Sequence, residues 1–127
     1  MSDVDFTYLY GDEDWAERAR SMLTGGASLI VVTRGTQGAQ AWHRKVGAIE
    51  VGAPAVKVVD TIGAGNSFQA ALLFALARLK RIERASLRAI DASELRKALS
   101  FACQCAALTC TRIGADPPRH GEVMGFW

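Results

Sequence analysis

The fold of this chain depends on one stretch of sequence, Val58-Val59-Asp60-Thr61-Ile62-Gly63-Ala64-Gly65-Asn66-Ser67-Phe68. A β-branched run ends at Asp60, a glycine-rich turn follows, and apolar residues then recur at helical spacing. These apolar residues are Phe68, Ala71, Leu72, Ala75, Leu76 and Leu79. The pattern predicts a strand, a tight turn and a helix whose N-terminus lies at the glycines.

The turn has the chemistry of an anion site. The first N–H groups of a helix have no partner within the helix, and they carry the positive end of its dipole. Gly63 and Gly65 place no side chain in front of these groups, so a phosphate can come close to them. No Lys-Ser or Lys-Thr pair closes the turn, so it is not a Walker A loop. A tight turn into a buried helix is the alternative interpretation of the same residues.

Length and composition limit the possible classes of protein. At 127 residues the chain is long enough for one domain with its own core. Hydrophobic residues make up 50% and charged residues 22%, as in ordinary soluble globular proteins. A net charge of +2 is too small to argue for nucleic acid, and no apolar run approaches the roughly 20 residues that cross a bilayer. We therefore expect neither nucleic acid nor a membrane as a partner.

The cysteines indicate a reducing compartment. Cys103, Cys105 and Cys110 contain no CxxC pair and have no histidine at ligand spacing. We expect reduced thiols that pack as small apolar groups in a cytoplasmic protein. The first residues are polar and acidic, so no signal peptide is expected either.

Periodicity and turn residues predict the elements before the opening stretch. Residues 4–10 alternate like a strand, Asp12 is placed to cap a helix over 13–24, and residues 29–32 have the pattern of a strand buried on both faces. Two shorter strands, 39–42 and 46–51, are predicted to form a hairpin. His43 is expected on its exposed turn, without a chemical role.

After the opening stretch, residues 80–89 are expected to be a polar connection. Asp91 and Glu94 then have the spacing of a capping box that opens a helix from about 92 to 111. The tail to Trp127 is expected at the periphery. This order of elements predicts an α/β fold whose sheet has too few strands to be complete.

Three motifs carry a resemblance to a known family. Residues 60–68 closely resemble the D-T-x-G-A-G-D-x-F signature of the ribokinase-like (pfkB-type) carbohydrate kinases. Residues 31–39, Val-Val-Thr-Arg-Gly-Thr-Gln-Gly-Ala, resemble the family's nucleotide-binding turn. Residues 101–118 are similar to its closing helix and loop, most of all in bacterial fructokinase-type members. In this order, residues 10–120 resemble the C-terminal part of such a kinase.

The resemblance implies a truncated ribokinase-like (Rossmann-like) three-layer α/β fold, with residues 1–127 as a single partial domain. Family chains are more than twice this length. We therefore expect the N-terminal half, with the sugar-binding residues and the lid, to be absent. The implied activity is ATP-dependent phosphoryl transfer to a sugar hydroxyl, such as that of fructose.

The resemblance also implies site residues. Magnesium is expected to arrive with ATP, and K⁺ is the candidate for a monovalent cation beside the anion hole. The implied nucleotide contacts are Thr33, Arg34, Gly35, Thr36, Gln37, Gly38, Gly65, Asn66 and Cys103. The implied anion hole is Gly63, Ala64 and Gly65. The positions matching the cation site are Asp60 by its side chain and Ile62, Thr109, Arg112, Gly114 and Pro118 by backbone carbonyls.

Asn66 departs from the family pattern, in which the catalytic base is an aspartate. A carboxylate can accept the proton of the attacking hydroxyl, whereas an amide can only orient that hydroxyl. We therefore expect this chain to be inactive by itself. Two alternatives stay open: a non-catalytic nucleotide- or phosphate-binding module, and a fragment that forms a homo-oligomer to cover its open sheet.

Overall fold

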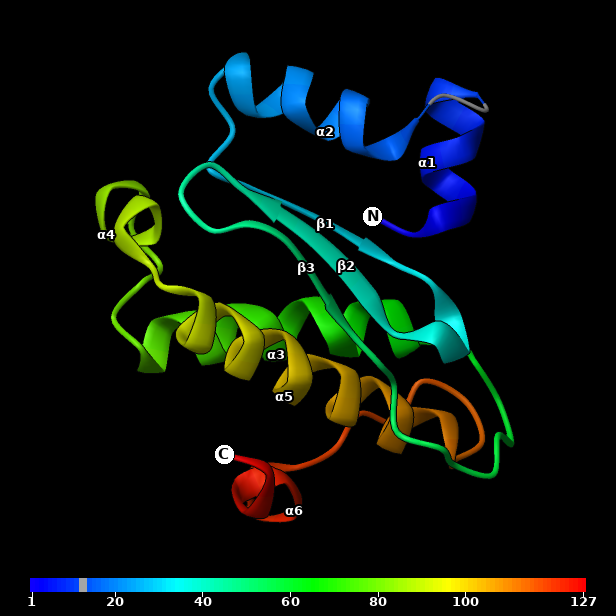
Figure 1. The fold of residues 1–127 in the computed structure, drawn as a ribbon. Helices are drawn as coiled ribbons and strands as arrows, with labels where there is room; N and C mark the ends of the chain where they lie inside the picture. Colours follow the sequence, from blue (N-terminus) through cyan, green and yellow to red (C-terminus); the bar gives the residue numbers. More distant parts are fainter. Residues whose placement is uncertain (12–13) are drawn as a thin grey trace.

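The computed structural model describes residues 1–11 and 14–127. Its elements follow one another along the chain as shown in Figure 1. They are α1 (Asp3–Tyr10), α2 (Trp15–Thr24), β1 (Leu29–Thr33), the 3₁₀ turn η1 (Gly35–Gln37), β2 (Ala39–His43), β3 (Gly47–Val51), α3 (Ala64–Arg78), α4 (Arg84–Ala89), α5 (Ala92–Cys110), α6 (His120–Val123) and the 3₁₀ turn η2 (Met124–Phe126).

The elements form three layers. The sheet contains β1, β2 and β3 in that order, and both neighbouring pairs are antiparallel. Helices α1 and α2 cover one face of the sheet, and α3 and α5 cover the other (Figure 1). This arrangement confirms the predicted α/β fold with an incomplete sheet and the predicted hairpin.

Strand β1 lies at an edge of the sheet and is not a strand buried on both faces, as the sequence suggested. Within β1 only Val32 is fully buried. On the far side of β1, the Thr33 N–H donates to Met1 O at 3.0 Å, and the Met1 amino group donates to Val31 O at 3.0 Å. Ser2 thereby forms a parallel bridge with Thr33. The continuous apolar run of β1 is thus partly covered by the first residues of the chain.

The alternation of side chains along the strands divides the core into two parts. Toward α3 and α5, β2 and β3 contribute small and branched residues such as Ala41 and Ile49. Toward α1 and α2, Val32 and Trp42 pack against Phe6 and the apolar face of α2. Because successive strand side chains point to opposite faces, one short sheet supports both layers of helices.

The N-terminal residues form a helix, so the predicted strand over residues 4–10 is wrong. Ser2 and Asp5 form a capping box at the start of α1. Phe6 is buried, and its ring lies 5.0 Å from that of Tyr10, one helical turn further on. In a strand, Val4 and Tyr8 would lie on the same face as Phe6 and be buried with it, but they are 74% and 88% exposed. The local cap therefore prevails over the two-residue alternation.

Helix α2 begins two residues later than the sequence suggested. The side chain of Asp14 caps it by accepting from the Ala16 N–H at 2.8 Å. The predicted cap, Asp12, lies outside the described residues. The helix ends before Gly25, as predicted.

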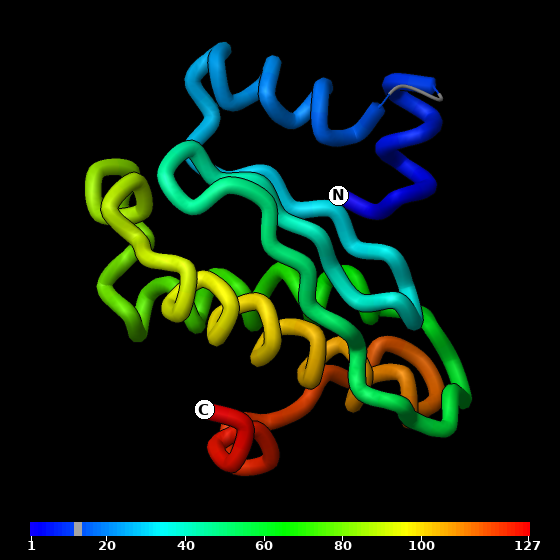
Figure 2. Tube along the Cα trace, in the orientation of Figure 1, coloured from blue at the N-terminus to red at the C-terminus, as the bar shows by residue number. Residues whose placement is uncertain are grey.

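The chain between β3 and α3 is extended but forms no strand, which corrects the predicted strand before Asp60. Figure 2 shows this segment leaving β3 and passing along the end of α5 before it enters α3. Its described backbone contacts to α5 are the N–H groups of Val59 and Asp60, which donate to Cys110 O at 2.8 and 3.2 Å. The β-branched side chains here line a cavity instead of joining a sheet.

Helices α3 and α5 pack along one another, and the predicted apolar face of α3 is buried between α5 and the sheet. The predicted capping box of Asp91 and Glu94 opens α5. The C-terminal tail is less peripheral than expected, because Val123 is buried in the core and the Trp127 ring packs on Phe101 at 5.5 Å. No helix in the described part of the chain is long and apolar enough to cross a membrane.

His43 is buried, so its predicted place on an exposed turn is wrong. It ends β2 with only 1% of its surface exposed. Its Nε2 lies 3.1 Å from Leu87 O in α4, a helix found where we expected a polar connection. Its Nδ1 accepts from the N–H groups of Lys45 and Val46 at 3.2 and 3.3 Å. The neutral imidazole thus joins the hairpin turn to α4.

Burial of this ring makes the stability of the fold depend on pH. Desolvation lowers the pKa of His43 below the ordinary 6.5, although the bond to Leu87 O opposes the shift. The unfolded chain therefore binds the proton first, and the free energy of unfolding falls as the pH drops below about 6.5, by at most about 1.4 kcal/mol per pH unit.

We expect His43→Gln to remove most of this pH dependence between pH 7.5 and 5.5, as measured by urea unfolding followed by circular dichroism. The window avoids the carboxylates, which titrate at lower pH. The exposed His120→Gln serves as the control, in which the decline should persist. An equal decline in the His43→Gln chain would contradict the assignment.

Candidate functional site

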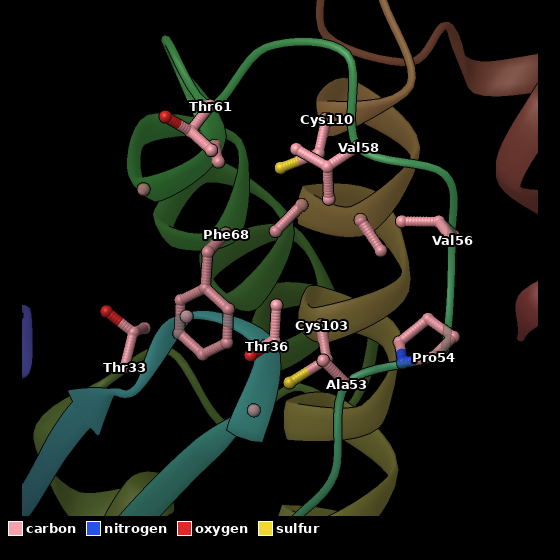
Figure 3. A pocket seen from close by; sticks show the side chains of 16 residues that line it. Thr33, Thr36, Ala53, Pro54, Val56, Val58, Thr61, Phe68, Cys103 and Cys110 are labelled. Carbon is pink, nitrogen blue, oxygen red and sulfur yellow. The ribbon is translucent and has the colours of Figure 1, made fainter.

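A cavity of about 210 Å³ lies between the loop after β1, the segment after β3, the start of α3 and one face of α5. Figure 3 shows its lining side chains around the surface of α5. They come from Thr33, Gly35, Thr36, Gly38, Ala53, Pro54, Val56, Val58, Thr61, Ala64, Gly65, Phe68, Cys103, Ala106, Ala107 and Cys110. Three parts of the chain far apart in sequence thus form one enclosure.

The N-terminus of α3 supplies free donors at this cavity. The Ala64 N–H is already used, because it donates to Thr61 O at 3.2 Å. The N–H groups of Gly65 and Asn66 have no acceptor within the described part of the chain, and no side chain caps the helix. Two such N–H groups at the positive end of a helix dipole are able to donate to an anion.

Gly63 and Gly65 have different roles in this turn. Gly63 adopts a left-handed backbone (φ 82°), and a Cβ there would lie 2.8 Å from the Cβ of Ala115. Only glycine fits such a conformation beside such a contact. Gly65 lies within α3, and a Cβ there would meet nothing within 4 Å. Gly63 therefore serves the fold, whereas Gly65 keeps open the space in front of the free donors.

Asp60 joins the turn to the loop after α5. One carboxylate oxygen accepts from the Ile62 N–H at 3.0 Å and the other from the Gly114 N–H at 2.8 Å. The bond from Ile62 has the larger effect and the bond from Gly114 the next, and both lower the pKa of Asp60 below its ordinary 3.8. The group is therefore charged at neutral pH. Its described contacts are those of a structural anchor.

A buried pair of hydroxyl groups connects α3 to α5. Thr109 Oγ1 and Ser67 Oγ lie 2.7 Å apart, and both residues are buried. Thr109 Oγ1 also lies 3.1 Å from Cys105 O. This contact fixes the first turn of α3 against the last turns of α5. The contact could not be predicted from the sequence, because it depends on how the two helices align.

The loop after β1 forms the opposite side of the cavity. The Arg34 N–H donates to Gly38 O at 2.7 Å and closes the loop. Gly38 has φ 94°, and a Cβ there would lie 2.1 Å from Val51 O, so only glycine fits. Thr33 and Thr36 line the cavity. Arg34 instead lies 3.6 Å from Glu50, and Gln37 is exposed outside the cavity lining.

The thiols in the cavity behave as small apolar groups. Cys103 is buried, and burial raises its pKa to about 11. The pKa of Cys110 is raised as well, by burial and then by the negative charge of Asp60. Both thiols therefore stay protonated at neutral pH, and they line the cavity together with Ala106 and Ala107.

Among the six predicted cation positions, described hydrogen bonds join Asp60, Ile62 and Gly114. Arg112 pairs with Asp116 at 3.5 Å and with Glu122. Pro118 lines a different hollow, beside Phe74 and Phe101. In the described part of the chain, no group of three or more His, Cys, Asp or Glu side chains is placed to hold a metal ion.

Reasoning from the sequence missed most of the apolar lining. The segment after β3 contributes Pro54, Val56 and Val58, and α5 contributes Ala106, Ala107 and Cys110. The alternation of Pro54, Val56 and Val58 was a signal, because residues that share one face of an extended segment repeat every second position. The strand predicted before Asp60 includes only Val58 of these three residues.

The chain is similar to a known family of proteins over most of its length. The family described as pfkB family carbohydrate kinase matches residues 8–120. A fructokinase from Solanum tuberosum is 37% identical over 127 residues, which cover 98% of this chain and 38% of the relative. These matches confirm the predicted family resemblance.

Solved structures show the same relationship. A fructokinase from Xylella fastidiosa with bound ATP superposes with a TM-score of 0.86 at 27% identity, over 98% of this chain and 40% of that one. A fructokinase double mutant from Vibrio cholerae O395, which contains fructose, ADP and a potassium ion, gives 0.76 at 25% identity, over 98% and 38%. The ribokinase-like fold is thereby confirmed, and the chain spans about two fifths of its relatives' length.

The two turn glycines should respond differently to the same substitution. Gly63→Ala should lower the free energy of unfolding by about 2 kcal/mol, because it strains the left-handed backbone and contacts Ala115. Gly65→Ala should leave stability unchanged or raise it by up to about 1 kcal/mol, since alanine favours a helix. Urea unfolding of the two variants beside the parent chain measures both effects. Equal destabilisation by the two substitutions would show that the roles are not divided in this way.

Proposed function

The chain belongs to the pfkB family of carbohydrate kinases, and from this premise we propose that it is the ATP-binding part of a sugar kinase. The proposed reaction transfers the γ-phosphoryl group of ATP to a sugar hydroxyl, as in the fructokinases it resembles. One observation carries the proposal. A single cavity joins an apolar lining to the free N–H groups at the start of α3.

This cavity suits the two ends of a nucleotide. Its volume of about 210 Å³ is below the roughly 300–1,000 Å³ of pockets that enclose a whole ligand, so we place the base inside and the phosphates at its mouth. The terminal phosphate then meets the N–H groups of Gly65 and Asn66. These donors stabilise the negative charge that spreads over the transferred group.

The residues of the site fit a magnesium ion carried by the nucleotide. Asp60 has both oxygens engaged by backbone N–H groups, so the phosphates would supply the main ligands. Bound there, the ion would neutralise charge on the transferred phosphoryl group. For K⁺, Ile62 and Gly114 lie beside Asp60, and we propose this junction as the place for a monovalent cation.

Asn66 limits what the chain can do with bound ATP. In the transfer, a sugar oxygen forms a bond to the γ-phosphorus, the bond to the β-phosphate oxygen breaks, and the hydroxyl proton must leave. Asn66 lies in the first turn of α3, where the family signature has aspartate, and its amide cannot accept that proton. Loss of a positioned base typically slows such a reaction by about 10² to 10⁴. Because the chain also spans only about two fifths of its relatives' length, we propose that it alone turns over no sugar.

A non-catalytic nucleotide-binding module is the second candidate, and Asn66 is the observation that favours it. Nothing in the anion turn or the apolar lining depends on a carboxylate at this position. Binding without turnover is the behaviour expected of such a module.

We expect saturable binding of ATP with magnesium, in the presence of potassium, by calorimetric titration. Gly65→Val should weaken binding more than tenfold, because its side chain enters the open space before the free donors while the helix remains intact. The matched control is Gly121→Val, at a glycine of α6 that also has no atom within 4 Å and lies outside the cavity. Absence of binding by the parent chain, or equal weakening by both variants, would refute the proposed site.

Restoring the carboxylate should not be sufficient for activity. We expect Asn66→Asp to produce no fructose phosphorylation above background in a coupled assay, because the chain spans only about two fifths of its relatives' length. An aspartate in the first turn of a helix favours folding, so a thermal melt no lower than that of the parent chain is the control. Measurable sugar phosphate from this variant would overturn the prediction.

A further inference from the structure

The wall of the cavity formed by the segment after β3 offers aliphatic side chains to a ligand. Figure 3 shows the side chains of Val56 and Val58 directed toward α5, with Pro54 further back on the same segment. They are alternate residues of an extended segment, and Ala55 and Lys57 between them are not in the cavity lining. In such a segment the amide groups lie in the plane of the backbone, perpendicular to the side chains. The ring of a ligand would therefore meet aliphatic carbon atoms on this side.

The opposite wall is equally apolar. It consists of Ala106, Ala107 and the two protonated thiols of α5, with Phe68 from α3. Together the two walls form a slot, defined here by Pro54, Val56, Val58, Phe68, Cys103, Ala106, Ala107 and Cys110. A flat aromatic ring in this slot would be held by its two faces, through dispersion and removal of apolar surface from water.

The slot contains no side chain that can distinguish one base from another. The hydroxyl groups in the cavity lining are those of Thr33, Thr36 and Thr61, which belong to the loop after β1 and the turn before α3. No amide, carboxylate, imidazole, guanidinium or ammonium side chain is among the lining residues of this described cavity. Recognition of a base depends on hydrogen bonds to its edge, whereas every base has a similar face.

From this we infer that the chain binds nucleoside triphosphates with little regard to the identity of the base. The inference rests on the proposed nucleotide site. Sites built to hydrogen-bond a ligand reject a wrong one by about 10⁴–10⁵, whereas apolar pockets discriminate by only about 10–200-fold. Purines should bind more tightly than pyrimidines, because a larger face contacts more of the slot.

Calorimetric titration of the chain with ATP, GTP and CTP, each with equal magnesium, tests the inference. The dissociation constants for ATP and GTP should differ by no more than about tenfold, and that for CTP should lie within about a hundredfold of both. ATP binding more than a hundredfold tighter than GTP binding would overturn the inference and leave the proposed function standing. Absence of binding by all three would instead refute the nucleotide site itself.

A pair of neighbouring variants tests the contact with the slot. Val58 and Val59 are similarly exposed, at 48% and 52%, but only Val58 lines the cavity. Val58→Asn should weaken the binding of ATP and of GTP by a similar factor of about five to ten. Val59→Asn should leave both affinities unchanged. Inorganic triphosphate, which has no base, should bind all three chains alike. If Val58→Asn weakened the binding of ATP but not of GTP, this wall would contact the edge of the base, and the inference would be refuted.

Discussion

The carboxylate of Asp60 connects two parts of the chain that are more than fifty residues apart, and the geometry of the site depends on this connection. It accepts from Ile62 in the turn before α3 and from Gly114 in the loop after α5. The close approach of Gly63 and Ala115 lies at the same junction. Because α3 and α5 also pack along their lengths, the free N–H groups of α3 are held at one fixed place beside the cavity.

The parts of the fold that the sequence predicted correctly are those determined by local chemistry. A capping box fixes the start of α5, and a long apolar period fixes the buried face of α3. The errors arose where two local signals compete or where tertiary contacts decide. In α1, the cap of Ser2 prevails over a short alternating pattern. His43 is polar enough for a turn, but it is buried because α4 provides a carbonyl for its ring.

The candidate site divides in the same way. Its glycines could be recognised because a left-handed backbone or a bare helix start requires that residue type. The contact of Thr109 with Ser67 could not, since it depends on how two helices align. The apolar slot was also missed, because Val56 and Val58 in sequence cannot be distinguished from a strand when the neighbouring strand is unknown. A motif thus locates the phosphate end of a site more reliably than the end that encloses the base.

The way the segment after β3 is attached has an evolutionary consequence. Its first part lines the cavity through side chains, and its described backbone bonds to α5 begin only at Val59. Replacing Pro54 or Val56 would therefore change the width of the slot without breaking a sheet or a helix. The anion turn has no such freedom, because the left-handed Gly63 packs against Ala115. Selection can thus alter ligand preference at one end of the cavity while the chemistry at the other end stays constant.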